Sequence, residues 1–465
     1  MRYSRVSLRL TLLAALTVAG ARGIAQQPTQ QAAAVDPRVA LSDSAIRAVI
    51  KERVDAKRSS GIAVGILDPD GRTRVFAYGT SGTSRPLDAN SVFEIGSITK
   101  TFTATILADM VARGEVRLDD PVAKYLPDSA HVPSRNGKQI TLVDLAIQSS
   151  GLPRLPSNLA PRDPGNPYAD YSVQQLYAFL AGYQLTRDIG ATYEYSNLGM
   201  GLLGLALARK AGTSYEALVT RRILTPLGMR ETAITLTPAM RAHLAPGHDA
   251  DGNVVPNWDM PTLAAAGALR STTRDMLTYV AANLDTTSGL GRAMQTAHTP
   301  RHEAGSPNMR IGLAWHILSR PAGNLVWHNG GTGGYRTFSG FDPARRIGVV
   351  VLSNLNAGVD DIGFHLLDET FPLEQPAAQR VEVTVDSMVL ARYVGEYELA
   401  PAFHIAVTRE GMSLFVQATA QPRFRIYAES DSTFFLKVVD AQVTFRPDAL
   451  VLHQNGQSIP GRKLR

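Results

Sequence analysis

The sequence of 465 residues contains no cysteine. This absence excludes disulfides, a catalytic thiolate, cysteine-ligated zinc and a lipid-modified N-terminal cysteine. The ten histidines show no His-Glu-x-x-His or other metal-ligand spacing. A phosphate-binding loop, a dinucleotide fingerprint and a Gly-x-Ser-x-Gly nucleophile elbow are also missing. We therefore expect neither a metal nor an organic cofactor.

Long apolar runs are scarce, and the most prominent one lies near the N-terminus. Residues 1–25 carry four arginines and no acidic residue, with an apolar run at 10–21 and small residues at Gly23 and Ala25. These are the parts of a signal peptide. The alternative is a membrane anchor, but a span needs roughly 20 apolar residues. We expect cleavage after Ala25 and an exported protein, periplasmic or extracellular, without a membrane span.

The mature chain has only a small excess of positive charge. The net charge of +6 suits a nucleic-acid partner, but without the four N-terminal arginines 43 basic side chains face 41 acidic ones. We therefore expect no nucleic-acid partner. Hydrophobic residues at 44% and charged residues at 19% are typical of a globular protein, and the length predicts two or three domains.

The first half of the chain begins with a flexible leader predicted at 26–40, which is rich in Gln, Ala, Thr and Pro. Helical spacing follows at 42–57, with Ser42 as a plausible N-cap. Apolar runs at 61–67 and 72–78 flank a turn sequence and predict a β-hairpin. Further elements are predicted as helices at 97–113, 173–181, 198–211 and 360–371, and as strands at 325–328, 335–341 and 347–353.

Strand patterns at both ends with helices between them indicate an α+β domain over 41–372. We expect an antiparallel sheet closed by the N- and C-terminal segments, flanked by helices, together with a helical lobe. Residues 373–387 have the composition of a linker. Short strands then recur over 388–465, which predicts a small β-barrel or sandwich domain. They are expected at 394–399, 404–408, 414–418, 424–427, 434–439, 443–445 and 450–453.

The motif Ser97-Ile-Thr-Lys100 places a hydroxyl and an amine one helical turn apart. A serine is a weak nucleophile at neutral pH, and a neighbouring amine lowers the cost of removing its proton. Free N–H groups at the helix start also favour an anion at Ser97. The alternative is a helix-start serine followed by a solvent-exposed lysine.

Tyr195-Ser-Asn197 is a second candidate. A tyrosine near two cations can lose its proton well below its reference pKa of about 10 and act as a general base. Asn197 has the groups to hold the lysine amine or a substrate amide. The alternative is a turn that contains a packed tyrosine.

A glycine-dense run at 327–335 contains His328-Asn-Gly-Gly331. Glycines let the backbone approach a ligand closely. An N–H group of this run would form an oxyanion hole with that of Ser97. The alternative is a tight turn at a sheet edge.

The ordered set Ser-x-x-Lys, Tyr-x-Asn and His-x-Gly resembles the serine β-lactamase and penicillin-binding protein superfamily, in its class C β-lactamase version. The resemblance covers about 40–372, and the tail from Leu390 resembles the small β domain often appended to such hydrolases. Its further landmarks are Phe93-Glu-Ile-Gly-Ser97, Leu118-Asp-Asp-Pro-Val122, Gln148-Ser-Ser-Gly-Leu-Pro153, Pro226-Leu-Gly-Met229 and Gly267-Ala-Leu-Arg-Ser271.

The resemblance implies a two-lobe fold with the site between the lobes. Ser97 would be the acylated nucleophile, and Lys100 and Tyr195 would share the proton transfers. Asn197 would orient Lys100 and the substrate amide. The oxyanion hole would consist of the Ser97 and Gly331 N–H groups. The pocket wall on the sheet edge would comprise His328, Asn329 and Gly330.

The third motif departs from the Lys-Thr-Gly that is usual in true β-lactamases of this type. An ammonium attracts a substrate carboxylate and lowers the tyrosine pKa, whereas a histidine is mostly neutral at pH 7. The His-x-Gly form resembles some D-alanyl-D-alanine peptidases, D-aminopeptidases and esterases. Arg336 is either a replacement cation or a surface arginine. Residues 163–171 are either a lid or an ordinary loop.

These observations predict an exported serine hydrolase that cleaves a β-lactam or a D-Ala-D-Ala-type amide, with a small molecule or a cell-wall peptide as substrate. One alternative is an esterase or D-aminopeptidase. Another is a penicillin-binding protein that acylates and stops, and a third is a scaffold role of the C-terminal β domain. The sequence leaves the oligomeric state open.

Overall fold

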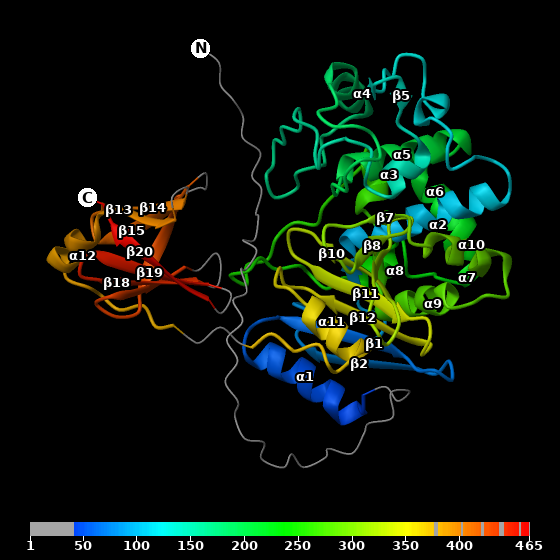
Figure 1. Cartoon of the computed structure of the whole chain (residues 1–465). Coiled ribbons are helices and arrows are strands. Elements are labelled where there is room, and N and C mark those ends of the chain that lie inside the picture. Colours follow the sequence, from blue (N-terminus) through cyan, green and yellow to red (C-terminus); the bar gives the residue numbers. More distant parts are fainter. Residues whose placement is uncertain are drawn as a thin grey trace. The chain divides into compact units, whose positions relative to one another are not determined.

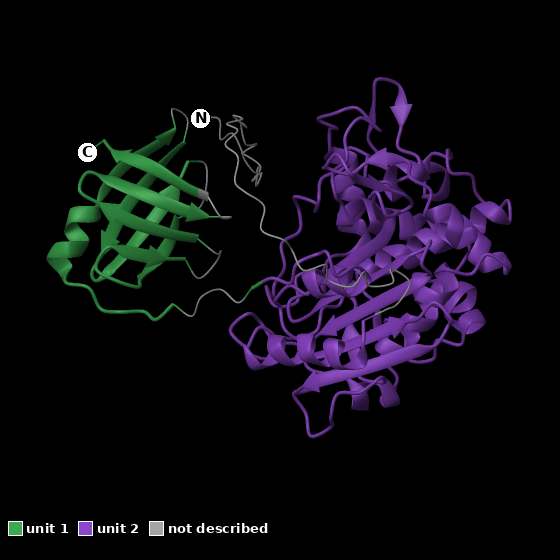
Figure 2. Ribbon diagram, turned by 60° about the horizontal axis from the view of Figure 1, so that its bottom comes forward, with its two compact units in different colours: residues 1–31, 375–465 green, residues 32–374 purple. Residues whose placement is uncertain are grey.

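A computed structural model describes residues 41–375, 380–400, 403–419, 423–436, 441–454 and 457–464. The chain forms two compact units that divide after Glu374 (Figure 2). The predicted signal peptide at 1–25 and the leader at 26–40 lie outside the described residues. No helix among the described residues has the length and apolar character that crossing a membrane requires.

The larger unit is built on an eight-stranded antiparallel sheet (Figure 1). The hairpin from the N-terminal part pairs with the last strand of the unit, as the sequence predicts. In spatial order the strands are β2 (Thr73–Gly79), β1 (Gly61–Leu67), β12 (Ile347–Ser353), β11 (Arg336–Asp342), β10 (Leu325–Gly331), β9 (His316–Leu318), β8 (Met309–Ile311) and β7 (His302–Glu303).

Helices cover both faces of this sheet, and so every residue of β1 and β12 is buried. On one face Ile62 and Val64 belong to an apolar cluster with α1 (Asp43–Asp55) and α11 (Asp360–Leu367). On the other face Ala63 and Leu67 belong to the cluster that contains α9 (Thr273–Asn283) and the helical lobe. The alternation of side chains along a strand therefore links the sheet to two separate cores.

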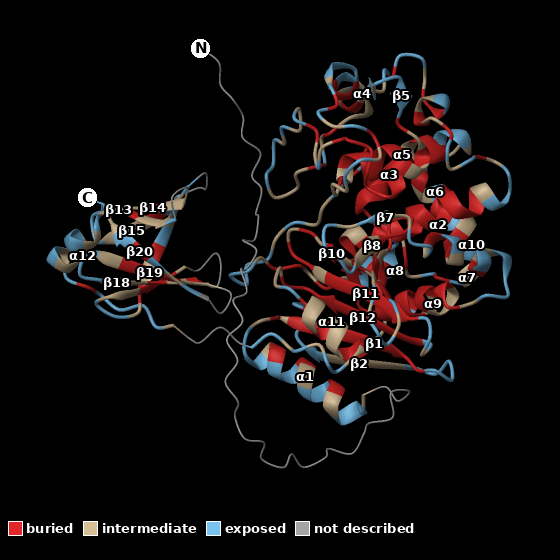
Figure 3. Cartoon of the chain, viewed as in Figure 1, coloured by how far each residue is buried: buried red, intermediate tan, exposed pale blue. Residues whose placement is uncertain are grey.

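The helical lobe surrounds α2 (Thr99–Ala112), in which every residue from Thr99 to Met110 is buried (Figure 3). A helix that is buried all round belongs in the centre of a large core. Its other elements are η2 (Val122–Tyr125), α3 (Leu142–Ala146), α4 (Val173–Gly182), α5 (Asn197–Lys210), α6 (Tyr215–Val219), η3 (Thr220–Leu224), α7 (Thr225–Leu227), η4 (Ala264–Ala266) and α10 (Gly289–Ala297). The short helix α8 (Pro238–His243) belongs instead to a small separate cluster with Val92 and Leu236.

Two short ribbons complete the larger unit, β3 (Val92–Glu94) with β6 (Arg270–Thr272) and β4 (Ser134–Arg135) with β5 (Lys138–Gln139). The predicted helix at 360–371 is shorter than expected, because Asp368 adopts an extended conformation and ends α11. The mixed α+β architecture with a sheet closed by both ends of the domain is confirmed.

The smaller unit is a closed antiparallel barrel preceded by α12 (Ser387–Tyr393). It has its own apolar core. Its strands are β13 (Gly395–Ala400), β14 (Phe403–Glu410), β15 (Ser413–Ala418), β16 (Arg423–Ala428), β17 (Thr433–Phe435), β18 (Ala441–Arg446), β19 (Ala449–Gln454) and β20 (Gln457–Lys463). Strand β20 was not predicted from the sequence, since Pro460 and Gly461 are unusual inside a strand.

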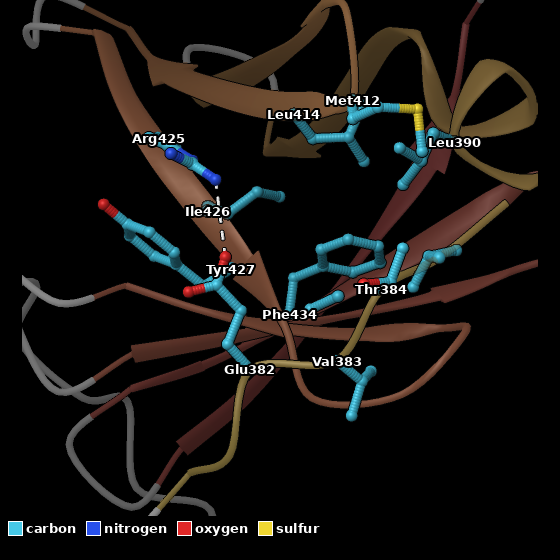
Figure 4. Close-up of a pocket in the computed structure, with 12 residues that line it drawn as sticks. Glu382, Val383, Thr384, Leu390, Met412, Leu414, Arg425, Ile426, Tyr427 and Phe434 are labelled. Carbon is cyan, nitrogen blue, oxygen red and sulfur yellow. Dashed lines mark hydrogen bonds and ion pairs between the residues drawn. The ribbon is translucent and has the colours of Figure 1, made fainter. Parts of the chain in front are cut away.

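A pocket of about 410 Å³ lies in this unit between the barrel wall and the segment that leads into α12 (Figure 4). Leu390, Leu414 and Phe434 form a buried apolar part of its lining. The ion pair of Arg425 with Glu382 lies at its side, at 3.4 Å. The pocket has the volume of a small-molecule site.

Candidate active site

The chain segment that precedes Ser97 is fixed by a buried ion pair. Glu94 in β3 lies opposite Arg270 in β6, and their side chains are 3.2 Å apart and almost fully buried. Two of the sequence landmarks therefore pair with each other. After β3 the backbone turns at Gly96, whose φ of +51° favours glycine. This turn places Ser97 in the short helix η1 (Gly96–Ile98), directly before α2.

Lys100 lies in the first turn of α2, and its side chain is completely buried. Its Nζ is 2.9 Å from the Ser97 Oγ, as the i, i+3 spacing predicts. Two further oxygens surround the amine, the Asn197 Oδ1 at 2.8 Å and the Ala266 carbonyl at 2.6 Å. The structure thus brings Asn197 to Ser97 and Lys100, although Asn197 is 97 positions from Lys100 in the sequence.

The environment of Lys100 favours a neutral amine. Burial lowers the pKa of Lys100 well below its usual value, and the positive charge of Arg154 lowers it further. A neutral amine has two N–H groups and one lone pair. The two N–H groups match the oxygens of Asn197 and Ala266, which leaves the lone pair for the hydroxyl proton of Ser97. This arrangement can remove the proton from the serine.

The second motif lies at the start of α5. Ser196 caps this helix, since its Oγ accepts a hydrogen bond from the Gly199 N–H at 2.8 Å. Tyr195 therefore lies just outside the helix, with its ring centroid 4.7 Å from the Lys100 Nζ. Burial raises the pKa of Tyr195 well above its usual value, although a hydrogen bond with Ser97 opposes this rise. Tyr195 is thus a protonated phenol that can donate a proton.

The segment at 163–171 also reaches the site. The Asn197 Nδ2 lies 3.4 Å from the Tyr168 hydroxyl oxygen, and the Tyr168 ring packs edge-to-face against Trp258. Tyr168 is almost fully buried. The segment therefore forms part of the wall around Asn197.

His328 lies on β10 and faces the second motif, with its ring centroid 6.3 Å from that of Tyr195. Its Nδ1 donates to the Asn329 carbonyl at 2.6 Å, so the neutral ring has an unprotonated Nε2. This Nε2 is buried and has no hydrogen-bond partner among the described residues. Burial, His316 and Lys100 all lower the pKa of His328 well below its usual value. His328 is an uncharged acceptor here.

The β10 edge beside Ser97 is open from His328 onward, because β9 pairs with β10 only as far as Trp327. The opposite edge of the strand pairs with β11 throughout. Gly330 lies so close to the Ile95 carbonyl that a Cβ atom would overlap it. The backbone nitrogen of Gly331 likewise lies next to Gly96. Glycine at both positions therefore lets the strand lie directly against the turn that carries Ser97.

Asn329 and Arg336 form a polar cluster on the face of β10 opposite to that of His328. The Asn329 Nδ2 donates to the Asp360 Oδ2 at 2.5 Å, at the start of α11. Burial raises the pKa of Asp360 to about 6, against the effects of Asn329 and Arg336. The Arg336 guanidinium occupies the space where a Gly331 Cβ atom would lie. Arg336 is thus half-buried at the strand edge, not a freely exposed surface arginine.

Three further residues of the site were not predicted from the sequence. The Tyr193 hydroxyl lies 3.0 Å from the Nε2 of His316, a buried histidine whose pKa is lowered to about 4 by burial and Lys100. Arg154 lies with its guanidinium carbon 5.0 Å from the Tyr195 ring centroid. Tyr193 lies beside the second motif and Arg154 directly follows a sequence landmark, so their positions in the sequence could have indicated that they belong to the site. Nothing in the sequence around His316 indicates its place in the site.

Comparison with known proteins agrees with this geometry. A family model described as Beta-lactamase matches residues 46–367, which include all three motifs. The chain belongs to the Beta-lactamase family. The resemblance seen in the sequence is thereby confirmed. A second model, described as a domain of unknown function (DUF3471), matches residues 379–450 of this family member.

Curated relatives and solved structures cover most of the larger unit. A β-lactamase from Lysobacter lactamgenus is 28% identical over 366 residues, which are 71% of this chain and 91% of the relative. The D-alanyl-D-alanine-carboxypeptidase/endopeptidase AmpH from Escherichia coli (strain K12) is 30% identical over 69% of this chain and 88% of its own. A class C β-lactamase structure from Rhodobacter sphaeroides has a TM-score of 0.60 at 25% identity, covering 68% of this chain and 95% of that one.

Proposed function

We propose that the protein is an exported serine hydrolase that cleaves a β-lactam or a D-Ala-D-Ala-type amide through an acyl-enzyme on Ser97. The observation that carries this proposal is the buried Lys100 amine, 2.9 Å from the Ser97 Oγ and hydrogen-bonded to Asn197 and Ala266. Relatives named β-lactamase and D-alanyl-D-alanine-carboxypeptidase support the reaction class. The signal-peptide pattern of residues 1–25 supports export.

Acylation begins when Lys100 takes the Ser97 hydroxyl proton and the Oγ attacks the carbonyl carbon of the substrate. The oxyanion that forms receives hydrogen bonds from the Ser97 and Gly331 N–H groups. When the C–N bond breaks, the Tyr195 hydroxyl donates its proton to the leaving nitrogen. The Lys100 ammonium then returns a proton to Tyr195. Water finally hydrolyses the ester, which releases the acid and restores Ser97.

Asn197 keeps the lysine amine in place for these transfers through its Oδ1, while its position at the start of α5 is fixed by the Ser196 cap. We assign the wall of the substrate site to the open edge of β10, with His328 as a neutral acceptor. Arg336, whose guanidinium lies over Gly331 at the end of this strand, supplies a cation for a substrate carboxylate. This assignment favours substrates that carry a carboxylate, as penicillins and D-alanyl peptides do.

The proposal is tested by following the intact mass of the mature protein after mixing with a penicillin, over seconds to hours. A transient adduct with consumption of the drug indicates a β-lactamase, and a persistent adduct indicates a penicillin-binding peptidase. Absence of an adduct moves the assignment to an esterase or D-aminopeptidase, which a nitrophenyl ester then tests. Ser97→Ala must abolish the adduct and turnover, and substantial turnover by this variant refutes the mechanism.

A further inference from the structure

Arg154 lies in a loop that is fixed to the start of α5. Its carbonyl oxygen accepts hydrogen bonds from the N–H groups of Asn197, at 3.0 Å, and Leu198, at 3.3 Å. The loop and the second motif therefore form one connected structure. This anchoring holds the Arg154 side chain at the edge of the site.

The Arg154 guanidinium and the Lys100 amine lie near the same aromatic ring. The guanidinium carbon is 5.0 Å and the amine nitrogen 4.7 Å from the ring centroid of Tyr195. Cations at such distances interact with the ring electrostatically. Arg154 is thus close to both groups to which the mechanism assigns proton transfers.

The charge of Arg154 is not neutralised within the described part of the chain, where no carboxylate forms an ion pair with it. Arg187, in the same region, differs in this respect. Its guanidinium forms an ion pair with Glu194 at 2.7 Å. Arg154 therefore contributes a positive field to the site, whereas the field of Arg187 is largely cancelled.

The other titratable groups around Lys100 and Tyr195 in the described structure carry no charge near neutral pH. Burial lowers the pKa of His316 to about 4 and that of His328 well below its usual value. Burial raises the pKa of Tyr168 and raises the pKa of Tyr193 to about 12. Arg154 is consequently the permanent cation among the described groups that face the lysine and the tyrosine.

We propose that Arg154 is a positioning residue that keeps Lys100 in its neutral, proton-accepting form and favours proton release by Tyr195. It supplies the positive charge that a lysine at position 328 would supply and that His328 lacks. A nearby cation disfavours the ammonium form of a lysine and favours the phenolate form of a tyrosine. This inference rests on the proposed function, since it concerns the proton transfers of acylation.

The test compares Arg154→Gln with wild type in the full-length mature protein. The rate constant for modification of Ser97 by a penicillin is measured from pH 5 to pH 10, or by a nitrophenyl ester where the penicillin gives no adduct. Loss of the cation raises the pKa of Lys100, so the amine becomes neutral at higher pH. We expect the acidic limb of the profile to move up by at most about one pH unit, because Arg154 is exposed and solvent screens its charge.

No basic limb from Tyr195 is expected in this range, since burial holds its pKa well above the usual value of about 10. Arg154→Lys, which keeps the charge, recovers at least half of the shift, and Arg187→Gln leaves the acidic limb in place. A lower rate in Arg154→Gln with an unmoved acidic limb overturns the inference. Turnover by Ser97→Ala instead overturns the proposed function, so the two failures are distinct.

Discussion

Gly96→Ala tests whether close contact between the Ser97 turn and β10 is needed for the reaction. A Cβ atom at position 96 would lie 2.7 Å from the Gly331 nitrogen, whereas ordinary contacts begin near 3.4 Å. The two backbones must therefore separate by about 0.7 Å. These backbones carry the two N–H groups that we assign to the oxyanion hole, so the variant widens the hole at the point where charge develops.

The expected loss in kcat/KM is about 10-fold to 100-fold, because a misplacement near 1 Å costs about 10²-fold in rate. This loss corresponds to about 1.4–2.7 kcal/mol of transition-state stabilisation. The positive φ of Gly96 adds a separate cost of about 1–2 kcal/mol to the stability of the fold. The assay is the rate of acylation by a penicillin or a nitrophenyl ester, together with a denaturant titration of the same sample.

Gly114→Ala is the matched control. Gly114 ends the same helix α2, has a φ of +69° and has open space around its Cβ position. It therefore shares the backbone strain without the clash, and we expect it to lose stability but keep wild-type kcat/KM. A folded Gly96→Ala variant with wild-type kcat/KM would refute the assigned oxyanion hole.

Two further predictions concern Asp360 and Arg336, which lie near Asn329 and Gly331 of β10. Asp360 has a pKa raised to about 6, so the folded protein holds this proton at higher pH than the unfolded chain, and the contribution of Asp360 to stability declines as the pH rises from 4 through 6. Asp360→Asn removes this decline, and its free energy of unfolding should gain up to about 3 kcal/mol relative to wild type between pH 4 and pH 7.5. Parallel pH dependences in denaturant titrations contradict this prediction. Arg336→Gln should lower kcat/KM about 10-fold for a penicillin but change it little for the penicillin methyl ester, because a hydrogen bond to a charged group is lost only for the free acid. Equal losses for both substrates would exclude Arg336 as the carboxylate-binding group.

Local patterns in the sequence predicted most of the elements that position the site. The run at 347–353 has the bounds of β12, and the Ser97–Lys100 contact follows from one helical turn. Contacts between residues that are far apart in the sequence could hardly be predicted from it. The Ala266 carbonyl beside Lys100 is a backbone group, and its approach to α2 depends on tertiary packing. The proximity of Asp360 to Asn329 likewise depends on how α11 packs against the sheet.

This chain has His328 at the position where a lysine is usual in the third motif. The two effects of that lysine's ammonium can still be supplied by other cations. One effect is attraction of a substrate carboxylate, and the other is a field that favours proton release from the tyrosine. In the proposed arrangement Arg336 exerts the first from the strand edge, and Arg154 exerts the second from the loop before α5. The two cations lie on different segments, so each can be removed without the other. Arg336→Gln should then alter substrate preference at constant pH dependence, whereas Arg154→Gln should shift the pH profile for acids and esters alike.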